Sequence, residues 1–163
     1  MTVYSLGVMN CLCSGRVFSA FAALVAFFGV GSVVEVVGDD LTYEIIGDTA
    51  TVTYCEKFAT GHLEIPSTYE GKPITNIGDY AFFGCRRIES ITIPDSVASI
   101  GDQAFSQCSS LTSITIPDSV TSMGHSTFSH CSNLTEVAIS NSLKSIPIDA
   151  FSNCVKLKVV LIP

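Results

Sequence analysis

Hydrophobic and polar residues follow one another along the second half of the chain in a pattern that repeats every 23 residues. Each copy has an aliphatic residue three positions after a cysteine and then an apolar-polar-apolar triplet, as in Leu111, Ile114 and Ile116. The cysteines that mark the copies are Cys85, Cys108, Cys131 and Cys154. A fixed period of this length predicts a solenoid, in which equivalent residues of successive copies stack and share one core.

The pattern within one copy predicts its local structure. The period-two alternation at the end of Leu111–Ile116 favours a short strand, and Pro117 ends it because proline cannot donate to a strand ladder. Met123-Gly124 predicts a turn, and residues 126–129 predict about one helical turn that points Phe128 inward. Stacking at ~4.8 Å would align equivalent side chains in ladders. We expect three of these side chains to be almost fully buried: Phe105, Phe128 and Phe151.

The copy that follows Cys131 departs from this pattern at two positions. Ser140 stands where the preceding copies have proline, and Pro147 stands where they have glycine. We therefore expect a bend or an altered turn in this copy. Its Ile146 still occupies the apolar column that contains Ile100 and Met123.

Upstream of the repeats, a β-hairpin is expected. Two runs rich in β-branched residues, Leu41–Ile46 and Thr49–Tyr54, flank Gly47-Asp48, which is typical of a two-residue hairpin turn. Such a hairpin would cap the N-terminal end of the solenoid. At the other end, the sequence finishes on an apolar strand within a repeat, which predicts self-association through that uncapped C-terminal strand or a truncated fragment.

An apolar run without charge covers residues 17–34, with Arg16 before it and Glu35 after it. This polarity is typical of a secretory signal peptide or of an uncleaved signal anchor, and both alternatives predict export. Membrane contact would come only from residues 17–34, if they are not cleaved. The predicted organisation is residues 1–37 as signal peptide or anchor, 38–60 as hairpin cap, and 61–163 as repeats, of which the last is incomplete.

The repeat pattern resembles a known family. The consensus L-x-x-I-x-I-P-x-x-V-x-x-I-G-x-x-A-F-x-x-C, at its 23-residue period, is similar to the BspA-like leucine-rich repeats over Ile65 to Pro163. The resemblance implies an α/β repeat solenoid, a right-handed leucine-rich-repeat horseshoe with short strands and short helical or 3-10 turns. It also implies a secreted or cell-surface protein used for adhesion and protein recognition.

Composition and charge exclude some classes of protein. The chain has 163 residues, of which 47% are hydrophobic and 14% charged, which is too apolar for a disordered chain. The formal net charge is −7, and the eight basic residues are scattered along the sequence. We therefore expect no nucleic-acid partner.

No set of residues in the sequence predicts catalysis, a metal site or a cofactor. The repeat cysteines would lie near ~5 Å apart, within reach of a disulfide. We nevertheless expect buried structural thiols, because parallel ladder side chains do not face one another; the 23-residue spacing does not suit zinc. His125 and His130 fall in variable, exposed columns. Asp95 and Asp118 could form a weak calcium ladder, but turn aspartates that bond their own backbone are the preferred interpretation.

The outward positions of the predicted strands form the candidate binding face. The concave side of the horseshoe would present the following residues: Ser90, Thr92, Ser113, Thr115, Glu136, Ala138, Val159 and Leu161. Hydroxyl groups dominate this face, which turns apolar toward the C-terminus. The sequence thus predicts a non-enzymatic exported binding module for an unidentified protein or glycan; the alternative is a structural spacer or a fragment of a larger surface protein.

Overall fold

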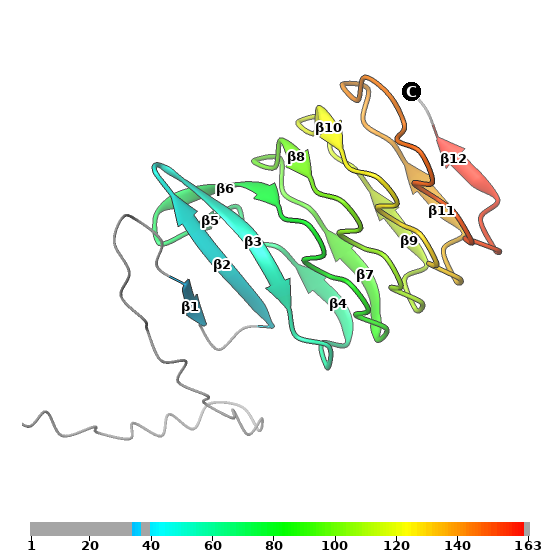
Figure 1. The fold of residues 1–163 in the computed structure, drawn as a ribbon, viewed down its shortest axis with the longest axis horizontal. Coiled ribbons are helices and arrows are strands. Elements are labelled where there is room, and N and C mark those ends of the chain that lie inside the picture. The colour runs from blue at the N-terminus through cyan, green and yellow to red at the C-terminus, as the bar shows by residue number, and fades with distance from the viewer. Residues whose placement is uncertain (1–33, 37–39, 162–163) are drawn as a thin grey trace, which may run out of the picture.

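The computed structural model describes residues 34–36 and 40–161, and these form a β-solenoid built from two sheets (Figure 1). Residues 17–33 of the predicted apolar run 17–34, and most of the segment 1–37, lie outside the described residues. No helix within the described part of the chain is long and apolar enough to cross a membrane. Each repeat contributes one strand to a five-stranded sheet, and some repeats also contribute a second short strand to a seven-stranded sheet.

The five-stranded sheet contains the strands that the alternating pattern predicts. All its neighbours are parallel, and the register matches equivalent residues of successive copies, such as Ser90 with Ser113 and Ile91 with Ile114. In spatial order, its strands are β12 (Val159–Leu161), β11 (Glu136–Ala138), β9 (Ser113–Thr115), β7 (Ile88–Thr92) and β4 (Gly61–Glu64).

The seven-stranded sheet joins the hairpin to the repeats. The hairpin forms as predicted, and its second strand also pairs in parallel with the first repeat strand, so that the hairpin extends this sheet. The strands in spatial order are β1 (Val34–Val36), β2 (Leu41–Ile46), β3 (Thr49–Cys55), β6 (Lys72–Ile77), β8 (Ser99–Ile100) and β10 (Ser122–Met123), with β5 (Thr68–Tyr69) beside β6.

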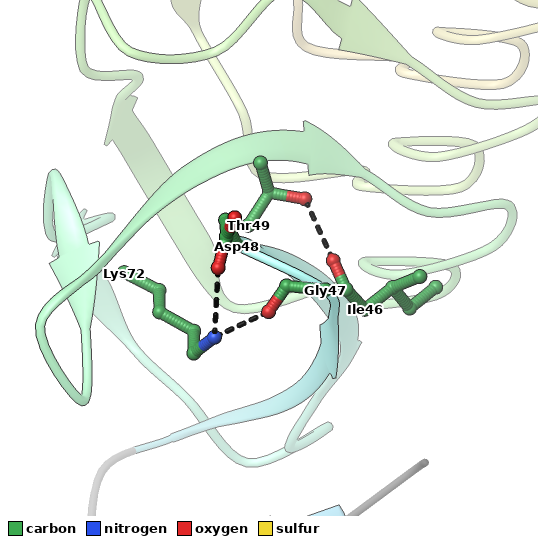
Figure 2. Close-up of polar contacts among 5 residues, drawn as sticks. All are labelled: Ile46, Gly47, Asp48, Thr49 and Lys72. Carbon is green, nitrogen blue, oxygen red and sulfur yellow. Dashed lines mark hydrogen bonds and ion pairs between the residues drawn. The ribbon is translucent and has the colours of Figure 1, made fainter. Parts of the chain in front are cut away.

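Side-chain contacts tie the hairpin turn to the first repeat (Figure 2). The ammonium group of Lys72, at the start of β6, donates to the carbonyl of Gly47 and lies 3.7 Å from the Asp48 carboxylate. Thr49 Oγ1 donates to the Ile46 carbonyl over 3.3 Å, which closes the turn from within. Gly47 has a φ of 62°, a conformation that glycine adopts without steric cost. The hairpin is therefore held to the solenoid at its tip as well as along β3.

A stack of phenylalanines runs through the core. Phe82, Phe105 and Phe128 are completely buried, and neighbouring rings are nearly parallel, with centroids 4.9 and 5.3 Å apart. Phe151 continues the stack at 5.6 Å from Phe128. The expectation of near-complete burial was wrong for Phe151, which is only half-buried. Among the described residues, Phe151 is the last ring of the stack and is covered by a neighbouring ring on one side only.

The predicted helical turn at residues 126–129 does not form, and the described residues contain turns in place of α or 3-10 helices. Alternate amides leave their own copy: Phe105 N–H donates to the Thr127 carbonyl over 2.9 Å, whereas Ser106 N–H donates to Gln103. Gln103 and Gln107 adopt positive φ values of 52° and 62°, which reverse the chain direction twice. These consecutive turns hydrogen-bond neighbouring copies to each other, and a helix would direct the same amides inside one copy.

Close packing of the backbone explains why a glycine recurs every 23 residues. Gly78, Gly101 and Gly124 occupy equivalent positions of successive copies. A Cβ on Gly101 would lie 2.6 Å from the Asp79 amide nitrogen and 2.8 Å from the Gly78 carbonyl carbon. The side chain of Asp79 accepts a hydrogen bond of 2.8 Å from the Asp102 amide, across the same contact. Backbones of adjacent copies thus touch where a side chain would separate them.

The altered turn expected in the copy after Cys131 is found. Ser140 Oγ donates to the Val120 carbonyl and accepts from the Ser142 amide, at 2.9 and 3.0 Å. Pro147 replaces the ladder glycine, and no strand forms beside β10 in this copy. Ile146 is 44% exposed, whereas Ile100 in the same column is buried.

Candidate binding face

Outward-pointing residues of the five-stranded sheet form two rows, which we call the strand face. Strand β9 shows why: Ser113 and Thr115 are exposed, whereas Ile114 between them is buried, because successive side chains of a strand point to opposite sides. Parallel pairing then aligns the rows across strands. The first row is His62, Ser90, Ser113, Glu136 and Val159; the second is Glu64, Thr92, Thr115, Ala138 and Leu161.

Histidine 62 belongs to the strand face, although the sequence analysis did not identify it. Its Nδ1 lies 2.8 Å from Ser90 Oγ and its Nε2 lies 3.3 Å from Thr92 Oγ1, so one imidazole bridges both rows. A signal was available, because Leu63 and Ile65 repeat the apolar spacing of Ile91 and Ile93. The long loop after Ile65 obscured this copy, and the register pairs Leu63 with Ile91.

A hollow lies on the strand face at its N-terminal half. Its polar lining consists of His62, Ser90, Thr92, Asp95, Ser113 and Thr115. Ser90, Thr92, Ser113 and Thr115 are short side chains on β7 and β9, which have a neighbouring strand on each side, whereas His62 lies on the outermost strand β4. Such a surface offers hydroxyl, imidazole and carboxylate groups for hydrogen bonds, in positions that change little on binding.

The character of the strand face changes along the solenoid. Glu64 and Glu136 place exposed carboxylates on it, and Ala138 is half-buried. At β12, Val159 and Leu161 are 42% and 49% exposed. The outward residues therefore lie on one side of the sheet, which is polar at β4–β9 and apolar at β12.

Other candidate residues occupy structural positions. Asp118 accepts a hydrogen bond of 3.0 Å from the Asn141 amide of the next copy, and Asp102 accepts one of 2.7 Å from the His125 amide. The two candidate histidines of the repeats, His125 and His130, are exposed. Within residues 34–36 and 40–161, no three His, Cys, Asp or Glu side chains are grouped so that they could hold a metal ion.

Comparison with known proteins identifies the repeat. The family model of the BspA type leucine rich repeat region matches residues 52–163 in six copies. The chain belongs to this BspA-type family. The match begins within β3, so that it takes in part of the hairpin as well as the cysteine-marked copies.

Solved structures of bacterial leucine-rich repeat proteins share the fold of this BspA-type chain. One from Bacteroides capillosus is 30% identical, with a TM-score of 0.68, over 80% of this chain and 98% of that one. A leucine rich cell surface protein from Faecalibacterium prausnitzii is 26% identical, with a TM-score of 0.62, over 82% of this chain and 44% of that one. A leucine-rich repeat protein of T. pallidum is 26% identical, with a TM-score of 0.59, over 74% and 68% respectively. The comparison with curated proteins gives no significant match.

The cysteine of each BspA-type copy bonds the backbone of the preceding copy. Cys108 Sγ donates to the Phe82 carbonyl over 3.2 Å, and Cys131 Sγ donates to the Phe105 carbonyl over 3.1 Å. Both thiols are completely buried, and burial raises the pKa of Cys108 above its ordinary value. These cysteines therefore act as small hydrogen-bonding core residues, and Cys154, which is half-buried, makes the same bond to Phe128 over 3.0 Å.

We expect the repeat cysteines to react with a thiol reagent in the order of their exposure. Cys154 should react first in native buffer, and Cys108 and Cys131 should react only on unfolding, because a neutral, inaccessible thiol is a poor nucleophile. Mass spectrometry after timed labelling measures this order. Detection of a native Cys108–Cys131 disulfide would contradict it.

The same burial predicts a pH dependence. Unfolded thiols ionise as the pH rises past about 8.5, while the buried thiol of Cys108 stays protonated. The unfolded state is thus favoured at alkaline pH, and the free energy of unfolding should fall above that value. Denaturant titrations across this range test it, with Cys108→Ala as the control that should weaken the dependence without removing it, because Cys131 is buried as well.

Proposed function

We propose that this chain is an exported, non-enzymatic binding module that recognises a protein or glycan through the strand face. The observation that carries the proposal is the hollow bounded by His62, Ser90, Thr92, Ser113 and Thr115, where the imidazole is hydrogen-bonded to both rows of hydroxyl groups. We also propose that the repeats curve as a right-handed horseshoe, with the strand face on its concave side.

The rigid support of the strand face favours recognition. In the central strands the row residues alternate with buried neighbours, such as Ile91 at 6% and Ile114 at 4% exposure. The side chains are therefore presented by a fixed backbone, and little conformational entropy is lost when a partner binds. Short polar side chains also leave room for a partner to approach the sheet closely.

Export rests on two separate observations. The uncharged run at residues 17–34 follows Arg16, as in signal peptides and anchors. In addition, a structural relative is described as a cell surface protein. We therefore place the protein outside the cytoplasm, secreted or on the cell surface.

A structural spacer is the alternative function. The continuous phenylalanine stack and the inter-copy hydrogen bonds would make a stiff rod whether or not any face binds a ligand. The two functions differ in whether surface changes on the strand face alter attachment.

The double variant Thr92→Lys/Thr115→Lys should abolish attachment to a panel of immobilised host-cell and matrix proteins. Two long charged side chains would fill the hollow, and both positions are exposed, so folding should be unaffected. The matched control is Ala98→Lys/Thr121→Lys, which adds the same charge at exposed positions one repeat apart, beside the seven-stranded sheet. Unchanged attachment of the strand-face variant would favour the spacer.

A further inference from the structure

The fold gathers basic residues that the sequence scatters. Five of the positive side chains in the described part of the chain lie shortly before a strand of the five-stranded sheet. Because the strands of this sheet are parallel, their N-terminal ends meet at one edge of the solenoid. We call this the basic edge, and its positive residues are Lys57, Arg86, Arg87, Lys156 and Lys158.

Neutral groups hold these cations in place. Arg86 Nη2 donates to Gln107 Oε1 over 3.2 Å, and Lys156 Nζ donates to Asn133 Oδ1 over 2.7 Å. The guanidinium of Arg87 lies 5.8 Å from the centre of the Phe58 ring. Amides and an aromatic ring orient a charge without neutralising it.

No ion pair joins the basic edge to a carboxylate in the described part of the chain. Within residues 34–36 and 40–161, the ion pair found is Lys72 with Asp48, at the hairpin tip. Glu56 and Glu89, the acids nearest in sequence to the basic edge, form no such pair there. The five cations form no ion pair there, so they can attract anions locally although the net charge of the chain is −7.

A second hollow lies on this edge, lined by Arg86, Gln107, Ser109 and His130. It offers a guanidinium, an amide, a hydroxyl and an imidazole, and its lining contains no carboxylate. His130 Nε2 lies 3.2 Å from Asn153 Nδ2, which continues the polar row into the next copy. Guanidinium groups bind the oxygens of sulfate or carboxylate groups in pairs, so this donor set suits such an anion.

We propose that the basic edge binds an anionic polysaccharide, with sulfate or carboxylate groups on Arg86 and Lys156 and sugar hydroxyls on the amides between them. This surface is separate from the strand face, and the proposal goes beyond the proposed function. From β7 to β12 the sheet takes three steps of ~4.8 Å, so the backbones at Arg86 and Lys156 stand roughly 14 Å apart. The two side chains lean toward each other, onto Gln107 and Asn133, so that one short oligosaccharide can contact both charges.

The chemistry of the edge favours a polysaccharide over other polyanions. The edge consists of turns, so it has no free strand to which an acidic peptide could add. Single-stranded nucleic acids stack successive bases on a series of aromatic side chains, whereas the aromatic ring on the basic edge is Phe58, which is 76% exposed beside Arg87. Amide and hydroxyl groups between cations, as at Gln107, Ser109 and Asn133, match the hydroxyl groups of a sugar chain.

Binding of the full chain to immobilised heparin, measured by surface plasmon resonance at about 150 mM salt, tests the proposal. We expect an affinity that falls as salt rises, that falls about tenfold in Arg86→Gln and in Lys156→Gln, and that is lost in the double variant. The matched control is Lys144→Gln, which removes one exposed positive charge outside the basic edge and should leave the affinity unchanged.

Three results would overturn the proposal. Absence of heparin binding at this salt concentration is the first. An equal loss in Lys144→Gln would show that net charge alone matters. Equal or tighter binding of poly-glutamate or single-stranded DNA would assign the edge to another class of polyanion. Circular dichroism of each variant checks that the fold is retained, and loss of strand-face attachment in the same variants would reveal a general folding defect.

Discussion

Phe128→Ala should lower the free energy of unfolding by about 3–5 kcal/mol, because it removes a completely buried ring from the middle of the stack. The ring lies between Phe105 and Phe151, at centroid distances of 5.3 and 5.6 Å. Backbone bonds between the copies limit the collapse of the resulting cavity, since Phe128 N–H donates to the Ala150 carbonyl over 2.8 Å. Chemical denaturation followed by circular dichroism measures the loss.

Phe151→Ala is the matched control for this prediction. The same side chain is removed from the same column, but Phe151 is half-buried and makes its ring contact on one side, so its loss should be clearly smaller. Equal and small losses at both positions would contradict a stacked solenoid core. In a solenoid, stability depends on contacts between nearest neighbours, so a central change should cost more than a terminal one.

Gly101→Ala should destabilise the protein by about 3 kcal/mol, the upper end of the usual cost of overpacking. The added methyl group would lie 2.6 Å from the Asp79 amide nitrogen and 2.8 Å from the Gly78 carbonyl carbon, and backbone atoms cannot rotate away. The two copies would have to separate, which would also strain the hydrogen bond between Asp79 and the Asp102 amide. Thermal and denaturant unfolding measure the effect.

Gly78→Ala provides the comparison. There the nearest atom to an added Cβ is the Val52 carbonyl oxygen at 3.1 Å, a tight contact that a small shift relieves. We expect a loss well below that of Gly101→Ala. If Gly101→Ala were neutral, the close approach of adjacent backbones would not be a requirement of this fold.

Both proposed surfaces depend on the same repeat register. Ser90 pairs with Ser113 on the strand face, and Lys156 contacts Asn133 one repeat away on the basic edge. A change that separates the copies, such as Gly101→Ala, should therefore weaken binding at both surfaces together. Surface variants, in contrast, should affect one surface and leave the other intact.

The sequence by itself determined the solenoid and much of the strand face. The 23-residue period located the strands, the phenylalanine column and the outward positions Ser113 and Thr115, because alternation within a strand and stacking between copies are local, repeated properties. It also located the hairpin, since Gly47-Asp48 is a local turn signal; the contacts of Lys72 with this turn were visible only in the structure. The cysteine column was identified in the same way.

The tertiary structure alone decided what depends on contacts between copies. A helical turn looked compatible with residues 126–129, but the amides of these turns reach carbonyls of the next copy, which no single copy reveals. Ile146 became exposed because Pro147 ended the glycine ladder, and His62 joined the strand face across a long loop. The basic edge has the same origin. Parallel stacking places Arg86 and Lys156, three copies apart in sequence, at the N-terminal ends of strands in the same sheet.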